Sequence, residues 1–140
     1  MGTTISCYII CMINKLEAIA LVKDFLNSDL KREEWFMNVE PFVKAYILYG
    51  SVAKETNAVD SDIDVLIILP LEQEEKFTKG EYVYNYRNNE INIVLRSIEK
   101  LRLIAQEKTD TFQKEVFRKS EVIQDVDGEV TELLQTIVTI

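Results

Sequence analysis

The chain has 140 residues, of which 47% are hydrophobic and 29% charged, and its formal net charge is −8. This composition is typical of one globular domain and excludes a disordered or fibrous chain. The acidic balance disfavours a broad surface for extended DNA or RNA, because phosphate binding requires clustered lysine and arginine side chains. Histidine is absent from the sequence, which excludes imidazole acid–base chemistry and histidine-bound metals.

The first thirteen residues can be interpreted in two ways. Ile5 to Ile13 is apolar, but it is too short to span a bilayer and lacks the basic flank of a signal peptide. Residues 1–13 are therefore either a possible N-terminal extension, with the first eleven residues upstream of a shorter protein that starts at Met12, or a strand or helical turn packed on the core. Cys7 and Cys11 are too few for a zinc site, and we interpret them as buried reduced thiols of a cytoplasmic protein.

From residue 14 onward, the hydrophobic pattern predicts a mixture of helices and strands. Asn14 can cap the first helix, and Glu17 stands three residues later as in a capping box. Asn88-Asn89 favours a tight hairpin turn, because asparagine tolerates positive φ. In the first half of the chain, the expected elements are a helix over 14–27, an extended segment after Pro41, a strand over 43–49, a helical turn over 52–55 and a strand over 62–69. A short helix or loop over 71–80 and paired strands over 82–87 and 90–95 follow. The last expected elements are helices over 97–108 and 110–119, a strand at 122–123, and a helix over 131–140. We therefore expect an α+β fold with a small mixed β-sheet flanked by helices, in one domain over residues 1–140.

The segment most informative about function joins two of the expected strands. The first strand ends at Gly50, where the missing Cβ lets a ligand approach the backbone, and Ser51 adds a hydroxyl and an N–H suited to phosphate oxygens. The next strand carries Asp62 and Asp64, whose spacing of two places both side chains on one face. Two such carboxylates repel one another unless a cation joins them, and Mg²⁺ prefers oxygen ligands and phosphates. The pattern therefore predicts a magnesium and phosphate site.

These residues resemble the signature of a known superfamily. Gly50-Ser51-Val52-Ala53-Lys54-Glu55 and Ser61-Asp62-Ile63-Asp64 are similar to the GS-x10-D-x-D motif of DNA polymerase beta-like nucleotidyltransferases, especially the minimal single-domain members. The resemblance covers about residues 14–96. It implies transfer of a nucleoside monophosphate, which we expect to be AMP from ATP, to a hydroxyl with two Mg²⁺ ions. By this resemblance Asp62 and Asp64 bind metal and act in catalysis, and the expected nucleotide-binding residues are Gly50, Ser51, Lys54 and Ser61.

The chain departs from the family pattern in two places. Lys54-Glu55 replaces the usual Arg-Gly; the lysine can still contact a triphosphate as a point charge, and Glu55 is expected to face solvent. The family also has a third carboxylate on a neighbouring strand, where by pattern this chain has Asn92. An amide can coordinate Mg²⁺ but cannot accept a proton at neutral pH. Either Glu90, two residues away on the same strand face, supplies the third carboxylate, or one metal site is weakened.

Two functions compete on this evidence. One is a nucleotidyltransferase whose acceptor is a hydroxyl on a partner protein, because minimal family members commonly pair as antitoxins with a separate helical HEPN-domain protein. The other is a catalytically degenerate module of the same fold that binds nucleotide or a partner. Neither function involves a membrane.

Aromatic residues leave two further alternatives. Trp35-Phe36 is either a core anchor, which we favour, or an exposed partner patch. Tyr82, Tyr84 and Tyr86 share one strand face and serve either base stacking or cross-strand packing.

Overall fold

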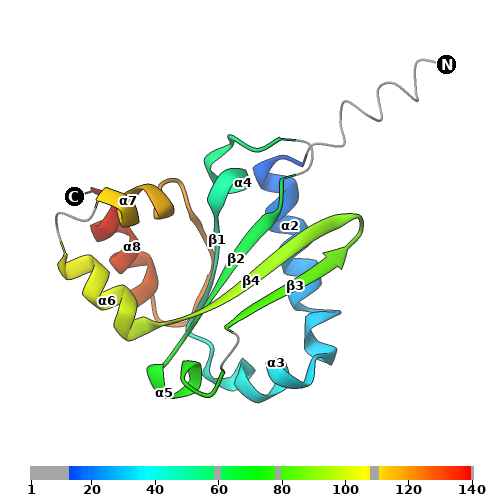
Figure 1. Ribbon diagram of the computed structural model, residues 1–140, viewed down its shortest axis with the longest axis horizontal. Coiled ribbons are helices and arrows are strands. Elements are labelled where there is room, and N and C mark those ends of the chain that lie inside the picture. The colour runs from blue at the N-terminus through cyan, green and yellow to red at the C-terminus, as the bar shows by residue number, and fades with distance from the viewer. Residues whose placement is uncertain (1–12, 59–60, 78–79, 108–110, 140) are drawn as a thin grey trace.

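The computed structural model describes residues 13–58, 61–77, 80–107 and 111–139 (Figure 1). The first twelve residues, with both cysteines, lie outside this part of the chain, so both interpretations of that segment stay predictions. Within the described ranges, no helix combines the length and apolar character needed to cross a bilayer.

A five-stranded mixed sheet forms the centre of the fold, with the strand order β3-β4-β2-β1-β5. β2 and β4 are parallel, whereas the other neighbouring strands are antiparallel. The strands are β1 (Ala45–Tyr49), β2 (Ile63–Leu69), β3 (Glu81–Tyr86), β4 (Asn89–Ser97) and β5 (Glu121–Asp125). The predicted α+β class with a small mixed sheet is confirmed.

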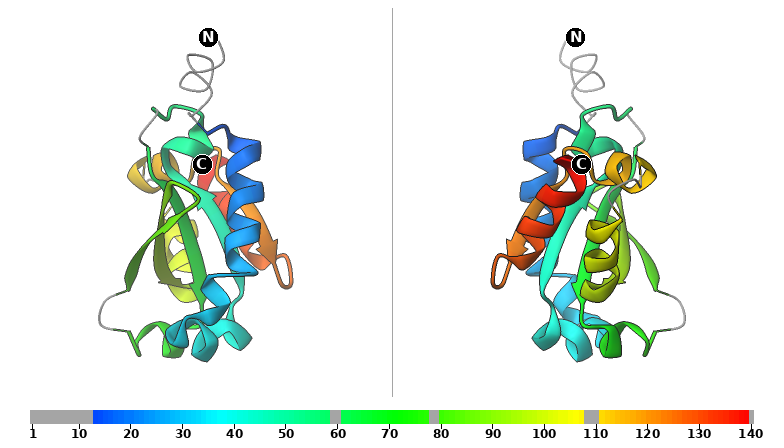
Figure 2. Two further views of the ribbon diagram at one scale, coloured as in Figure 1. Left: turned by 90° about the vertical axis from the view of Figure 1, so that its right-hand side faces the viewer. Right: turned by 90° about the vertical axis from the view of Figure 1, so that its left-hand side faces the viewer.

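Helices cover both faces of this sheet (Figures 1 and 2). Side chains of α2 and α3 share one hydrophobic core with one face of the sheet, and side chains of α6, α7 and α8 share a second core with the other face. The helices are α2 (Lys15–Leu26), α3 (Glu34–Val39), α4 (Gly50–Lys54), α5 (Leu71–Glu74), α6 (Ile98–Gln106), α7 (Thr111–Phe117) and α8 (Glu129–Thr139), with short 3₁₀ turns at Leu30–Arg32 and Glu40–Phe42.

The cap predicted at Asn14 is formed at the start of α2, and Ser97 forms a similar cap at α6. Asn14 Oδ1 accepts from the Glu17 amide at 2.8 Å, and Glu17 Oε1 accepts from the Asn14 amide at 3.1 Å. At α6, the Ser97 hydroxyl oxygen accepts from the Lys100 amide at 3.0 Å. Both caps satisfy amides that have no partner within the helix, so the starts of these helices are encoded locally.

β2 contributes side chains to both hydrophobic cores. Ile63, Val65 and Ile67 are buried toward α2 and α3, whereas Leu66 and Ile68 are buried toward α6 and α8. A central strand covered on both faces needs apolar residues at nearly every position.

The structure differs from the sequence expectation at the hairpin turn, at Pro41 and at the start of the last helix. The hairpin turn is Arg87-Asn88, with φ values of 48° and 65°, and not Asn88-Asn89; Arg87 is held there by an ion pair with Asp24 at 2.7 Å. The chain at Pro41 forms a 3₁₀ turn instead of an extended segment, because proline is tolerated in a first helical turn. The last helix begins at Glu129, where its amide donates to the Asp127 carboxylate.

The tyrosine row on β3 packs inside the molecule. Tyr82 stacks on Trp35 with ring centroids 4.1 Å apart, and Tyr84 accepts a hydrogen bond from the Trp35 indole at 2.7 Å. Tyr86 is buried against Phe25, and Phe36 is fully buried. The core interpretation of Trp35-Phe36 is confirmed. The tyrosine rings pack against Phe25 of α2 and Trp35 of α3, and base stacking stays a prediction.

Candidate active site

Two aspartates stand where β2 begins. Asp62 directly precedes the strand and Asp64 is its second residue, and both side chains are half-buried. Ile63 and Val65 are fully buried against the α2 layer. Strand alternation therefore places both carboxylates on the opposite face, which further along the strand packs against α6 and α8.

Gly50 brings the backbone of the first strand against Asp64. In the antiparallel register Tyr49 pairs with Asp64, so Gly50 follows directly at the end of β1. Its φ of +81° is a left-handed conformation, and a Cβ here would overlap Asp64 Oδ2 and lie 3.1 Å from Asp64 Cγ. Glycine is required at this position both by its conformation and by the space that Asp64 occupies.

Asn92 is the third side chain of the cluster. β4 runs parallel to β2 with Asn92 in register with Asp64. Its Nδ2 donates to Asp62 Oδ2 at 3.1 Å and to Asp64 Oδ1 at 3.5 Å. Asn92 Oδ1 is buried and has no hydrogen-bond partner in the described part of the chain. The amide therefore joins the two carboxylates, at the place where the family pattern has an acid.

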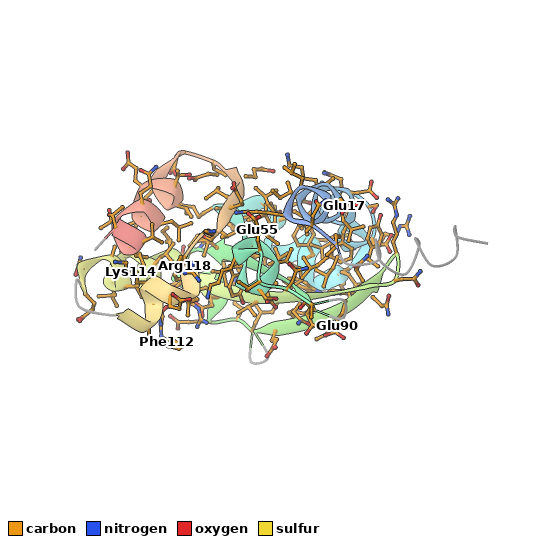
Figure 3. All side chains as sticks on the ribbon, turned by 90° about the horizontal axis from the view of Figure 1, so that it is seen from above. Glu17, Glu55, Glu90, Phe112, Lys114 and Arg118 are labelled. Carbon is orange, nitrogen blue, oxygen red and sulfur yellow. The ribbon has the colours of Figure 1, made fainter. Side chains whose placement is uncertain are left out.

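Glu90 lies outside this cluster. Its side chain is exposed, and Figure 3 shows it on the β3–β4 hairpin. The negative charge of Glu90 reaches Asp64 and contributes to raising its pKa. However, the described residues contain no group of three or more Asp, Glu or Cys side chains that could hold a metal ion. Of the two candidates for the third ligand, only Asn92 contacts both aspartates.

The pKa of Asp64 is raised above its ordinary value. Burial is the main cause; the charges of Asp62 and Glu90 add to it, and the hydrogen bond from Asn92 opposes it. Burial and the nearby Asp64 charge raise the pKa of Tyr49 to about 12, so its phenol is protonated at neutral pH. Both shifts indicate a partly desolvated, electronegative pocket that a cation would stabilise.

The predicted phosphate-binding residues lie on α4 and in the segment between α4 and β2. Ser51 is half-buried on the first turn of that helix. The Lys54 ammonium pairs with Glu115 of α7, with Nζ and Oε1 3.3 Å apart. The Ser61 hydroxyl oxygen accepts from the Ala58 amide at 2.7 Å, and thus closes the loop that leads to Asp62.

Sequence reasoning missed two neighbours of the site. Tyr49 directly precedes the glycine motif. Its position as the last residue of a buried strand could have indicated that it lies next to the site. Glu115 comes from a segment far along the chain, and nothing local signals its contact with Lys54. Glu55 is exposed as predicted, beside α4 (Figure 3). It adopts a left-handed conformation with φ 62°, and this explains why glycine is usual at this position.

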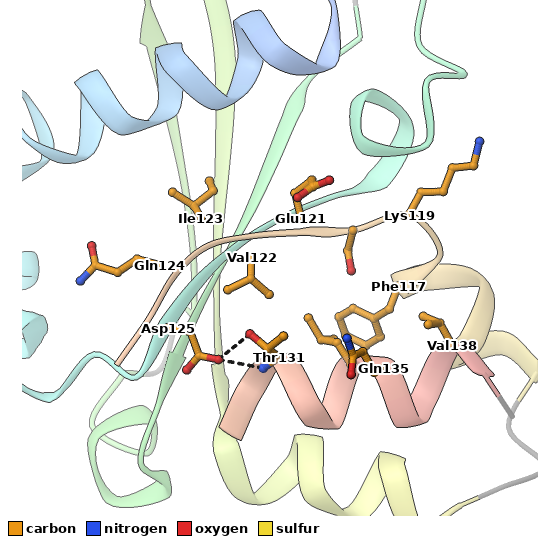
Figure 4. Close-up of a pocket in the computed structure, with 12 residues that line it drawn as sticks. Phe117, Lys119, Glu121, Val122, Ile123, Gln124, Asp125, Thr131, Gln135 and Val138 are labelled. Carbon is orange, nitrogen blue, oxygen red and sulfur yellow. Dashed lines mark hydrogen bonds between the residues drawn. The ribbon is translucent and has the colours of Figure 1, made fainter. Parts of the chain in front are cut away.

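A cavity of about 560 Å³ lies between β5 and α8 (Figure 4). Its lining includes Val122, Leu134 and Asp125, whose carboxylate accepts hydrogen bonds from the Thr131 amide and hydroxyl at 2.8 and 2.7 Å. None of the predicted site residues lines this cavity, so it is separate from the aspartate cluster.

Comparisons with known proteins address the family directly. The model of the nucleotidyltransferase domain family matches residues 22–128. Among solved structures, a nucleotidyltransferase-like protein from Exiguobacterium sibiricum 255-15 is similar with a TM-score of 0.47 and 12% identity, over 78% of this chain and 37% of that chain. A structure described as a toxin-antitoxin with AMP-PNP is similar with a TM-score of 0.40 and 12% identity, over 80% of this chain and 85% of that chain.

The chain thus spans 37% of the length of the first of these structures. No curated protein sequence is significantly similar to it. The family match, in contrast, covers more than half of the chain and includes the Gly50 turn, both aspartates and Asn92. The chain belongs to the nucleotidyltransferase domain family.

Proposed function

We propose that the chain is a Mg²⁺-dependent nucleotidyltransferase that transfers AMP from ATP to a hydroxyl acceptor. The observation that carries this proposal is the cluster of Asp62, Asp64 and Asn92 against the turn at Gly50. Family membership supports the reaction class. ATP as the nucleotide and a hydroxyl as the acceptor rest on the motif resemblance.

The donor set of the cluster fits Mg²⁺. Two carboxylates and an amide oxygen are hard ligands of the kind this ion prefers, with the remaining positions left for phosphate oxygens and water. Asn92 Oδ1 is buried without a partner, and the amide could present it to an ion by exchanging its two ends. Asp62, Asp64 and Asn92 would hold the ion, which would supply charge neutralisation on the transferring group. Two ions are expected with nucleotide bound.

On the protein side, the start of α4 positions the triphosphate. Asp64 occupies the space that the missing Gly50 side chain leaves, so the donors that we assign to a phosphate are the Ser51 amide and hydroxyl. Lys54 is the other cation of α4, but Glu115 pairs with it. We therefore assign the larger share of phosphate binding to Ser51.

Proton transfer from the acceptor hydroxyl falls to an aspartate. Asn92 cannot accept a proton at neutral pH. Asp62 and Asp64 are the two carboxylates of the cluster, and a carboxylate can accept the proton. We therefore assign this step to one of these two aspartates.

The acceptor that we propose is a hydroxyl on a partner protein, and a helical HEPN-domain protein is the partner that the family resemblance implies. The net charge of −8 supports this choice over a long nucleic acid. An antitoxin role follows from the same resemblance.

Calorimetry tests the binding step. Mg²⁺ and a non-hydrolysable ATP analogue should bind together more tightly than either binds alone, because the phosphates complete the ion's ligand shell. Asp62→Asn and Asp64→Asn should each weaken this coupling. Asp127→Asn serves as the matched control, because Asp127 pairs with Lys44 near the start of α8. Undiminished coupling in both site variants would remove the aspartates from the proposal.

One observation favours a second candidate, a nucleotide-binding module without transfer. The third position of the cluster is the amide of Asn92, and Glu90 does not join it. A transfer assay decides between the two functions. It uses ATP labelled at the α-phosphate and a cell extract as the source of acceptors, and the Asp64→Asn variant gives the background. Coupled Mg²⁺ and nucleotide binding without label transfer above background would establish the module.

A further inference from the structure

A second, smaller cavity opens on the same sheet face as the aspartates. It has a volume of about 140 Å³ and lies under α6 and α7. Leu66 lines it, two residues after Asp64 on β2 and on the same face. Two residues of strand span about 7 Å, so the cavity is a near neighbour of the aspartate cluster.

Arg96 lines this cavity and is unlike the other arginines. The sequence has five arginines, and four of them pair with carboxylates: Arg32, Arg87, Arg102 and Arg118. Arg96 is half-buried, yet within the described ranges its guanidinium has neither an ion pair nor a hydrogen bond. The chain has 24 acidic and 16 basic residues, so carboxylates are plentiful. A guanidinium withdrawn from water without a partner is costly, which indicates that Arg96 is kept for an anion that binds from outside.

Two further donors face the same cavity. Lys100, on the first turn of α6, lines it beside Arg96. Tyr49 also lines the cavity, and on β1 it pairs in register with Asp64, so its side chain is next to both the aspartate cluster and the Arg96 cavity. Glu81 is exposed on β3 and makes no ion pair with Arg96 in the described part of the chain. The lining of the cavity thus includes two cationic side chains and no carboxylate.

We propose that this cavity, the Arg96 pocket, binds a small anionic group, a carboxylate or a phosphate, carried by the acceptor substrate. Its volume is below the roughly 300–1,000 Å³ of typical small-molecule sites, which suits one anionic group and not a whole nucleotide. The assignment to the acceptor rests on the proposed function. The nucleotide triphosphate is placed at the α4 turn beyond the end of β1, whereas the Arg96 pocket lies in the other direction along the strands, toward α6.

Titration with inorganic phosphate at constant ionic strength tests the pocket itself. In NMR spectra of the full chain, phosphate should produce saturable shifts at the Arg96 Nε–H and around Tyr49. Arg96→Met should weaken phosphate binding at least tenfold, Arg96→Lys less, and Lys100→Met by a few-fold, because each removes or moves one donor. Arg102→Met is the matched control, since it breaks a pair with Glu129 between α6 and α8. Shifts that do not saturate, or equal affinity in Arg96→Met and wild type, would overturn the proposal.

A second titration separates the acceptor from the nucleotide as the source of the anion. With the Mg²⁺ complex of a non-hydrolysable ATP analogue at saturation, phosphate should still bind at the Arg96 pocket, and Arg96→Met should leave analogue affinity unchanged. Competition between phosphate and the analogue would assign the pocket to the triphosphate and overturn the acceptor assignment. A chain that binds no nucleotide defeats the proposed function, while the first titration still decides whether the pocket binds anions.

Discussion

The carboxylate of Asp64 occupies the space where a side chain at position 50 would stand. A Cβ on Gly50 would overlap Asp64 Oδ2, and the φ of +81° at Gly50 is itself disfavoured for any other residue. The end of β1 thus packs directly against the start of β2, because residue 50 has no side chain to keep Asp64 away. Glycine and aspartate in this motif depend on one another, although thirteen residues of chain lie between them.

Gly50→Ala should therefore disrupt both stability and nucleotide binding. The left-handed backbone costs about 1–2 kcal/mol with a Cβ present, and displacing Asp64 should bring the total to roughly 2–5 kcal/mol. Gly128→Ala is a matched control, because Gly128 has a φ of +83° but open space around its Cβ position. Denaturant unfolding measures both variants. Equal losses would mean that the contact with Asp64 contributes nothing.

Asp64→Asn should make the protein more stable at neutral pH. The folded-state pKa of Asp64 is raised, mainly by burial, so the folded state holds this proton more tightly than the unfolded state. Stability is therefore lost as the pH rises from the ordinary value of 3.8 through the raised folded pKa. Removing the charge should raise Tm at pH 7 by about 2–5 °C, the size typical of one stabilising substitution.

The pH dependence provides the check on this prediction. The increase in Tm of Asp64→Asn over wild type should vanish below pH 3.8, where the wild-type carboxyl is protonated in both the folded and the unfolded state. Asp127→Asn should behave in the opposite way, because hydrogen bonds from the Glu129 amide and Lys44 lower the pKa of Asp127. A lower Tm for Asp64→Asn than for wild type at pH 7 would contradict the assigned cost of ionising Asp64.

Asn92→Asp should couple stability to Mg²⁺ and increase transfer. A third carboxylate beside Asp62 and Asp64 adds like-charge repulsion, so Tm in a chelator should fall by several degrees. Mg²⁺ should restore it and produce a larger rise than in wild type. Asn85→Asp adds the same charge on exposed β3 and should show neither effect.

The transfer assay with labelled ATP completes the test of the third position. Transfer above wild type in Asn92→Asp is expected, because an aspartate there can both bind metal and accept a proton. Glu90→Gln should leave transfer unchanged, since Glu90 lies outside the cluster. A loss of transfer in Glu90→Gln would show that the hairpin moves to bring Glu90 to the site.

Glu55→Gly should stabilise the protein by about 0.5–1 kcal/mol. Glu55 adopts φ 62° with an exposed side chain, and glycine removes the strain of that conformation. Glu55→Ala keeps a Cβ and should gain nothing. Denaturant unfolding of the three proteins measures the difference, and equal stabilities would show that the turn after α4 carries no strain.

Local sequence determined the starts of α2 and α6, the two strands that flank the motif, and the face that Asp62 and Asp64 share. Asn14 and Ser97 cap their helices through contacts within three residues, and strand alternation has a period of two. Such features need no knowledge of distant chain segments. The same reasoning places Glu90 and Asn92 on one strand face and cannot choose between them.

That choice belongs to the tertiary structure. The parallel register of β2 with β4 sets Asn92 opposite Asp64 and leaves Glu90 at the exposed end of the hairpin. Packing of α7 likewise brings Glu115 to Lys54, and residues of α6 and α7 line the cavity with Arg96, which has no carboxylate partner among the described residues. These contacts join residues far apart in the chain. Periodicity specifies the direction of a side chain, whereas strand register and helix packing decide which distant side chain it meets.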